Sequence, residues 1–326
     1  MGDWELVIKN IKMNQNIKPS ELNCCFISGP VLSPTLLNAI QNWKIPVYVQ
    51  PPTPQLPESI NILQDMTAAS LIQDAVLIMN WEASLAFIIE NLSQQKLNQV
   101  NAFKNKAAFR QLVKELYPNL FYQELTRDKL QDFQLPKEVE NVVLKPSLGT
   151  ASIGIRTVNG QQEWEKAVNS VLRDIDKAKE QMNPTMLNDD SFLVEEFVDG
   201  DEFACDGFWD SSGKTVITGI YQHPFASSLD VSDTVYYTSK KVVAETIEPT
   251  IKVLEHIGIK LGMRRFPFHF EFRKSHNKIF PIELNPLRFG QVALPDITEY
   301  AFGFNPYDLF FTDKSPDWDY LLNNDS

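Results

Sequence analysis

Cysteine is scarce in this sequence, with 3 among 326 residues. Cys24 and Cys25 are adjacent, and Cys205 makes the count odd, so the sequence predicts no disulfide framework. The simplest interpretation is that all three are small buried hydrophobic residues. The lack of a disulfide framework is typical of a reducing compartment, and we therefore expect a cytoplasmic protein.

Long apolar runs are also missing. The first residues (MGDWE) carry no basic region ahead of an apolar stretch. The nearest approach to a membrane span, residues 75–79, is far shorter than a bilayer requires. We therefore expect neither a signal peptide nor a membrane partner.

Positively charged residues are fewer than negatively charged ones. The chain has 30 Lys and Arg residues and 42 Asp and Glu residues, which gives a net charge of −12. Such a chain repels a nucleic-acid backbone, so we expect no nucleic-acid partner. Two nucleotide motifs are absent as well. There is no Gly-x-Gly-x-x-Gly, and the spacing of Gly149 and Gly154 is followed by Ile155-Arg156 instead of the Lys-Ser/Thr of a Walker loop. Local cations and amides could still bind a single nucleotide.

The residues that are abundant indicate a globular protein with a sizeable core. Apolar residues make up 43% of the chain, charged residues 22%, and phenylalanine alone contributes 21 side chains. A chain of 326 residues suits two or three packed units.

The first hundred residues alternate between short strands and helices. Strands are predicted at 24–28, 46–49 and 75–80, with a helix at 34–43. This alternation predicts a parallel, doubly wound sheet, whose ligands bind beyond the carboxyl ends of the strands. The turn at 28–30 is then either a substrate-facing loop or an ordinary turn.

Three further helices are predicted from apolar periodicity and from their end signals. The first carries Phe109, Leu112, Val113 and Leu116 and ends before Pro118. The second runs from about 163 to 181, with a buried stripe of Trp164, Val168, Val171, Leu172 and Ile175. The third spans about 245–256, with Pro249 near its first turn and Gly258 past its end.

Two segments near the C-terminus alternate between apolar and polar residues, as half-buried strands do. In 266–273 the polar face carries His269, Glu271 and Arg273. In 279–285 the apolar face carries Phe280, Ile282 and Leu284, and the polar face carries Glu283 and Asn285. An odd-length turn at 274–278 would pair odd positions with odd positions and bring both polar faces together.

Glu271, Glu283 and Asn285 would then form one small patch. Two carboxylates held close across a sheet repel each other, so a raised pKa, a nearby Arg or a bound cation must offset that cost. Two carboxylates and an amide oxygen form an all-oxygen set that suits magnesium. The alternative is an exposed polar sheet face paired with Arg273 or Arg288.

Two other segments carry residues that could bind a nucleotide. An apolar strand at 142–144 delivers Lys145, and a loop rich in Gly and Ser follows, whose amides could approach phosphate oxygens. Taken alone this is a weak signal. The strand at 192–194 runs into Glu195 and Glu196, with Glu202 shortly after. These carboxylates either bind ribose hydroxyls beside an adenine edge or mark the solvated end of a hairpin.

Together, the order and spacing of these segments resemble the ATP-grasp superfamily across residues 101–312. That superfamily includes D-alanine–D-alanine ligase, biotin carboxylase and bacterial dipeptide ligases. The resemblance rests on Lys145 with its loop, on Glu195-Glu196-Phe197-Val198-x-Gly-x-Glu202, and on Glu271 with Glu283-x-Asn285-Pro286. It implies an α/β protein of the ATP-grasp fold, with two lobes that clasp ATP, residues 101–194 and 195–326, after a Rossmann-like domain, residues 1–100.

The resemblance also implies roles for individual residues. Lys106, Lys145 and the loop residues Ser147, Gly149, Ser152 and Gly154 would bind the phosphates. Glu195, Glu196, Phe197 and Val198 would contact adenine, and Glu202 the ribose. Glu271, Glu283 and Asn285 would bind Mg²⁺, with Mn²⁺ as an alternative. Arg288 and Lys145 would be catalytic, and His269 and Arg288 would contact the substrate.

One departure from the family pattern concerns the residue after Asn285-Pro286. The family often has Arg there, whereas this chain has Leu287 followed by Arg288. The implied function is an ADP-forming carboxylate–amine ligase that acts through an acyl phosphate on a small-molecule acid and amine. A small-molecule kinase and a non-catalytic ATP-binding regulatory protein are the alternatives. Family members are often homodimers.

Overall fold

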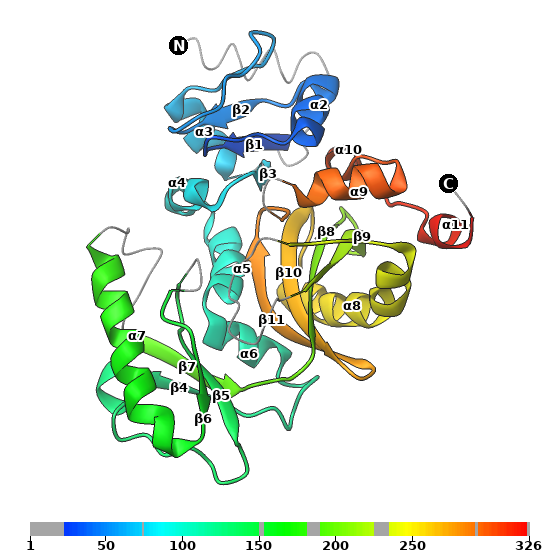
Figure 1. The fold of residues 1–326 in the computed structure, drawn as a ribbon. Coiled ribbons are helices and arrows are strands. Elements are labelled where there is room, and N and C mark those ends of the chain that lie inside the picture. The colour runs from blue at the N-terminus through cyan, green and yellow to red at the C-terminus, as the bar shows by residue number, and fades with distance from the viewer. Residues whose placement is uncertain are drawn as a thin grey trace.

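The computed structural model describes residues 23–73, 75–149, 153–180, 190–224, 235–290 and 293–324. Within these ranges the strands form three sheets, in the orders β2-β1-β3, β4-β7-β5-β6 and β11-β10-β8-β9. The first sheet lies at one end of the molecule, and α5 (Gln94–Lys104) and α6 (Lys106–Val113) lie between the second and third sheets (Figure 1). Both helices and sheets are therefore present, as the α/β prediction requires.

The first sheet is parallel, as the alternation of strands and helices predicts. It consists of β1 (Asn23–Ile27), β2 (Val47–Val49) and β3 (Val76–Met79), accompanied by α2 (Pro34–Trp43) and α3 (Asp65–Ile72). Helix α2 has the predicted bounds, because Ser33 caps its first turn and Lys44 ends it in a left-handed conformation. Ser28 follows β1, and its backbone N–H donates to the Asn80 side chain at 2.9 Å.

The second sheet is antiparallel and is covered on one face by α7 (Figure 1). Its strands are β4 (Tyr122–Thr126), β5 (Asn141–Pro146), β6 (Arg156–Asn159) and β7 (Ser191–Glu196). Helix α7 (Trp164–Lys179) buries the predicted stripe except for Leu172, which is half-buried. Val142, Leu144, Phe192 and Val194 pack against that stripe.

The third sheet is antiparallel and carries the phenylalanine-rich core. Its strands are β8 (Asp201–Trp209), β9 (Thr215–His223), β10 (Phe266–Ser275) and β11 (Lys278–Pro286). The four phenylalanines of β10 are buried in one cluster with residues of α8 (Lys240–Leu261). The opposite face of β10 presents His269, Glu271 and Arg273, as the alternation predicts.

The hairpin between β10 and β11 differs from the prediction in two respects. Its turn contains only His276 and Asn277, because Ser275 pairs with Lys278. That even-length turn pairs Arg273 with Phe280, so Phe280 leaves the apolar face that was predicted for it. A β-bulge at Ile282 then shifts the register by one residue, and Glu271 pairs with Glu283. The predicted convergence is confirmed, but the bulge produces it, not the turn.

Two helix ends also differ from the prediction. Helix α6 ends at Val113, and the chain continues in turns, with Leu116 40% exposed. Helix α8 extends from Lys240 to Leu261, so Pro249 lies in its interior and Gly258 lies before its end at Gly262. Gly258 fits there because a Cβ at this position would lie 2.3 Å from Nε1 of Trp209.

The segment after β7 is a connection between two sheets, not a hairpin. β7 belongs to the second sheet and β8 to the third, so residues 197–200 link the two lobes. We call this segment the hinge. The predicted boundaries at 100/101 and 194/195 fall within α5 and β7 respectively, and the domain limits stay a prediction.

Short helices complete the described structure. They are η2 (Glu82–Ser84), α4 (Leu85–Asn91), η3 (Arg127–Lys129), η4 (Gln161–Glu163), α9 (Leu294–Phe302), α10 (Pro306–Thr312) and α11 (Trp318–Asn323). Across the described residues, every helix is too short or too polar to span a bilayer.

Candidate nucleotide and metal site

Lys145 belongs to a buried charge cluster with Glu195 and Arg110. It projects from β5, and its Nζ lies 2.6 Å from the Glu195 carboxylate of β7. The same carboxylate pairs with the guanidinium of Arg110 from α6. All three side chains are more than nine-tenths buried. Because each buried charge has an opposite neighbour, the cluster can hold its charges out of water.

The pKa values of this cluster follow from burial and from the neighbouring charges. Burial lowers the pKa of Lys145, because a desolvated ammonium is disfavoured. Burial alone would raise the pKa of Glu195, but Arg110 and Lys145 outweigh it and lower that pKa to about 2. Glu195 is therefore ionised at neutral pH.

Glu195 was predicted to contact adenine, but its side chain forms ion pairs inside the protein. Its carboxylate is occupied by Lys145 and Arg110, and its backbone pairs with strands on both sides. In the next residue, Glu196, the backbone N–H donates to Phe121 and the side chain accepts from the Phe121 N–H. The part of the hinge open to a base therefore lies beyond Glu196.

Lys106 connects the two lobes at the start of α6. Its Nζ lies 3.1 Å from a Glu283 carboxylate oxygen and donates to the Gly149 carbonyl, also at 3.1 Å. Its backbone N–H donates to the Ser147 carbonyl at 2.8 Å. Burial opposes the charge of Lys106, but Glu283 outweighs that effect and raises its pKa. Lys106 is thus a charged contact between the Gly/Ser loop and the predicted metal residues.

The remaining loop residues differ in what they offer a phosphate. Ser147 is buried, its N–H donates to Ser191, and its hydroxyl contacts Ser191 and Glu124. Gly154 packs against α7, where a Cβ would lie 3.0 Å from Ile175. The Ser147 donors are therefore taken up by neighbouring residues, and the phosphate contacts of both residues stay a prediction. Ser152 lies outside the described residues.

The predicted metal residues share one patch of the third sheet. The Asn285 amide lies 3.2 Å from Glu271 and 3.1 Å from Glu283. Burial and the charge of Glu283 raise the pKa of Glu271. Burial would also raise the pKa of Glu283, but Lys106, Lys104 and Lys145 lower it.

This patch fits a hard divalent cation. Its donors are two carboxylates and one amide whose oxygen and nitrogen can exchange places by rotation. Each carboxylate keeps about a quarter of its side chain exposed, which leaves room for waters and phosphate oxygens. Among the described residues no three His, Cys, Asp or Glu side chains gather as a metal site.

His269 occupies a buried position beside this patch. Its Nδ1 lies 2.8 Å from Asp206, and its Nε2 lies 3.4 Å from Glu271. Burial alone would lower its pKa, but hydrogen bonds with Asp206 and Glu271 raise the pKa to about 9. Both ring nitrogens thus face carboxylates, an arrangement that favours a structural role for His269. Asp206 also accepts from the Gly290 N–H at 2.6 Å and so ties β8 to the chain after β11.

Arg288 lies just after β11 and is 5% exposed. Its Nη1 donates to the Phe289 carbonyl at 3.2 Å, and its Nε has no hydrogen-bond partner within the described part of the chain. Leu287 before it adopts a left-handed conformation with φ of 61°, and its carbonyl accepts from Met79 of β3. A buried guanidinium donor without a partner is suited to an anion.

Arg273 holds the hinge from the third sheet. Its Nε and Nη2 each lie 3.2 Å from Glu202, and its Nη1 donates to the Val198 carbonyl at 3.0 Å. Its guanidinium also lies 4.7 Å from the centre of the Phe197 ring. One side chain therefore fixes three of the residues predicted to contact adenine and ribose.

Several charged residues of this site were not predicted from the sequence. They are Arg110, Asp206, and the buried ion pair of Lys104 with Glu82. The spacing of Lys106 and Arg110, one helical turn apart, was a signal for Arg110. No sequence pattern relates Glu82 to Lys104, because only the packing of the first sheet brings them together.

The comparisons with known proteins agree with this geometry. Residues 138–296 match the family model of the ATP-grasp domain. No curated protein sequence matches the chain.

Solved structures of similar fold are numerous. The L-amino acid ligase of Bacillus licheniformis has a TM-score of 0.63 at 18% identity, over 89% of this chain and 73% of that one. Biotin carboxylase of Campylobacter jejuni has a TM-score of 0.59 at 13% identity, over 92% and 73%. D-alanine–D-alanine ligase of Bacillus anthracis, complexed with ATP, has a TM-score of 0.50 at 15% identity, over 90% and 95%. Residues 138–296 of this chain therefore form an ATP-grasp domain, and the fold of the described residues is similar to that of these enzymes.

Proposed function

We propose that this protein is an ATP-dependent carboxylate–amine ligase that releases ADP and phosphate and acts in the cytoplasm. The observation that carries the proposal is the meeting of two lysines from one lobe with two carboxylates and an amide from the other. Lys106 contacts Glu283 directly, and Lys145 contributes to the low pKa of that carboxylate. Similarity of fold to C–N ligases supports the same conclusion.

The chemistry proceeds in two steps. A carboxylate oxygen of the first substrate attacks the γ-phosphorus of ATP, and the bond to the bridging oxygen breaks to release ADP. The amine nitrogen then attacks the acyl carbon, the bond to the phosphate oxygen breaks, and the amine gives up a proton. Enzymes of this kind contribute mainly by positioning and by charge stabilisation.

Different residues of this chain supply the positioning and the charge stabilisation. Lys106 and Lys145 hold the phosphates, and the hinge with Glu202 holds the base and the ribose. Glu271, Glu283 and Asn285 would hold magnesium, which when bound neutralises charge on the phosphates. Arg288, buried and with a free Nε donor, stabilises the acyl phosphate as charge develops on it.

The decisive experiment measures products from purified protein with ATP, magnesium and pairs of amino acids and amines. A ligase forms ADP and phosphate only when both an acid and an amine are present, and hydroxylamine converts its acyl phosphate into a hydroxamate. Phosphorylated substrate without hydroxamate would instead identify a kinase. ATP binding without turnover across the whole screen would identify a regulatory protein.

Arg273→Lys should raise the KM for ATP by about tenfold and leave kcat within about twofold. Lysine keeps the charge but cannot pair with Glu202 through two nitrogens while also reaching Val198, so the hinge loses its fixed geometry. Steady-state kinetics with ATP as the varied substrate measures the effect. Arg173→Lys, an exposed change on α7, is the matched control. An unchanged KM for ATP would show that Arg273 does not position the nucleotide.

A further inference from the structure

The bulge at Ile282 is the feature that assembles the predicted metal patch. The two-residue turn pairs Arg273 with Phe280, and in that register Glu271 would face Ile282. Glu283 would then point to the opposite face of the sheet, because side chains alternate along a strand. The one-residue shift at the bulge returns Glu283 to the face of Glu271 and Asn285. The metal patch therefore depends on the bulge.

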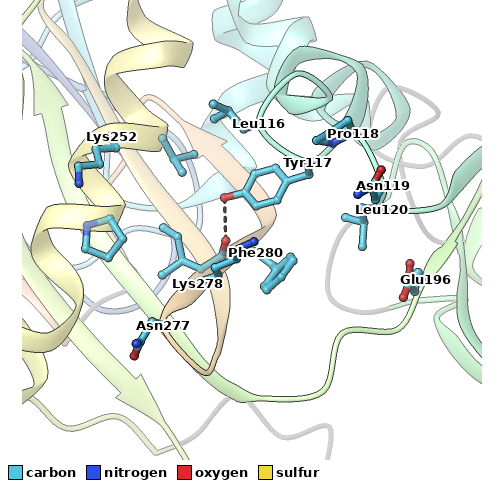
Figure 2. Close-up of a pocket in the computed structure, with 13 residues that line it drawn as sticks. Leu116, Tyr117, Pro118, Asn119, Leu120, Glu196, Lys252, Asn277, Lys278 and Phe280 are labelled. Carbon is cyan, nitrogen blue, oxygen red and sulfur yellow. Dashed lines mark hydrogen bonds between the residues drawn. The ribbon is translucent and has the colours of Figure 1, made fainter.

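The bulge lies in a strand that, as far as the chain is described, pairs on one side only. β11 is the edge strand of the third sheet within the described residues. A hollow of about 520 Å³ borders this edge, lined by segments that include 116–120 and 277–280 (Figure 2). On the outer side, no strand in the described part of the chain forms a ladder of hydrogen bonds that would fix the register of β11.

Side chains from α6 and the turn after it take the place of such a ladder. The Tyr117 hydroxyl donates to the Ile279 carbonyl at 2.7 Å. Figure 2 draws this hydrogen bond as a dashed line from the Tyr117 ring. Arg110 donates through Nη1 to the Pro281 carbonyl at 2.5 Å and through Nη2 to the Ile282 carbonyl at 3.3 Å. The guanidinium of Arg110 thus binds two consecutive carbonyls at the bulge itself.

Glu195 keeps Arg110 in this orientation. Its carboxylate pairs with Nε, which leaves both terminal nitrogens directed at β11. Arg110 is 4% exposed, so its carbonyl bonds form away from water, where an unmade bond is costly. A planar fork can satisfy this geometry, and a lysine ammonium on a flexible stem cannot reproduce it.

We propose that Arg110 is a positioning residue for the metal site: it holds the bulge that places Glu283 opposite Glu271. The proposal rests on the proposed function only in taking Glu271, Glu283 and Asn285 as the metal residues. Arg110 acts through the backbone of β11 and need not touch the ion or the nucleotide.

The test is Mn²⁺ binding to the full chain with ADP, followed by the electron paramagnetic resonance signal of free Mn²⁺. Arg110→Gln and Arg110→Lys should both weaken Mn²⁺ binding by roughly 10- to 100-fold, as the loss of a supporting partner of metal ligands does. Lysine preserves the ion pair with Glu195 but leaves the two carbonyls of β11 without their donor, so Arg110→Lys should lose less stability in urea than Arg110→Gln. Arg173→Lys serves as the control for both measurements.

The outcomes distinguish the role of Arg110 from the assignment of the metal residues. Weak Mn²⁺ binding by a stable Arg110→Lys protein supports the proposal. Wild-type Mn²⁺ affinity in Arg110→Lys and Arg110→Gln overturns it and leaves the proposed function standing. Recovery of Mn²⁺ affinity in step with stability in Arg110→Lys also overturns it, since charge alone would then suffice. If the wild type binds no Mn²⁺ with ADP, the metal assignment fails and takes this proposal with it.

Discussion

Glu283→Gln should lower ATP turnover by on the order of 10²–10³-fold while the protein stays folded. Glutamine keeps the shape of the side chain but removes the charge that faces both Lys106 and the metal patch. The loss should fall on kcat, because the charge on the phosphates grows as the γ-phosphoryl group moves. Phosphate release under saturating ATP and substrates measures it, and circular dichroism verifies the fold.

The matched control for this variant is Glu165→Gln, which alters an exposed carboxylate on α7. It should turn over ATP at the wild-type rate. If Glu283→Gln also retained wild-type turnover, residues 271, 283 and 285 would not be the metal site, and the proposed mechanism would lose its basis.

Glu195→Gln should destabilise the protein by about 3 kcal/mol at neutral pH, because it leaves Arg110 and Lys145 buried without a counter-charge. Equilibrium unfolding in urea at pH 7 gives the difference. Glu138→Gln, an exposed change in the segment before β5, should alter stability by less than about 0.5 kcal/mol.

The same variant should change how stability depends on pH. The folded-state pKa of Glu195 is about 2, below its ordinary value of 4.5. A carboxylate with a lowered pKa stabilises the fold fully above the unfolded-state value, and this stabilisation fades as the pH falls from about 4.5 towards 2. The stability gap between the wild type and Glu195→Gln should therefore narrow over that range. A gap that stays constant from pH 6 to pH 3 would contradict the ion-pair explanation.

Much of the fold follows from local patterns that a sequence displays directly. The parallel first sheet was predicted from the alternation of strands and helices, because a parallel strand needs a crossover helix. Helix α2 has the predicted bounds because Ser33 and Lys44 end it by local interactions. Helix α8 was predicted too short, because Pro249 resembles a first-turn residue and Gly258 a helix end when packing against Trp209 is unknown.

The candidate site also contains residues that local sequence patterns identify and residues whose roles depend on tertiary packing. Lys145 and the Glu271–Glu283–Asn285 set could be named from the sequence, since each lies in a short pattern with its own chemistry, whereas Lys106 was named from the family resemblance. The contacts of Arg273 with the hinge and of Glu195 with Lys145 could not be foreseen, because the partners are distant in the sequence.

By itself, the sequence determined which side chains share a face along β10, because the two-residue repeat of a β-strand is a property of the backbone and no bulge interrupts it there. The three-dimensional structure alone decided how the two strands are registered. The short turn would have separated Glu283 from Glu271, and the bulge restores their pairing. The bulge contacts a guanidinium from a distant helix, and a contact between remote segments leaves no trace in local sequence.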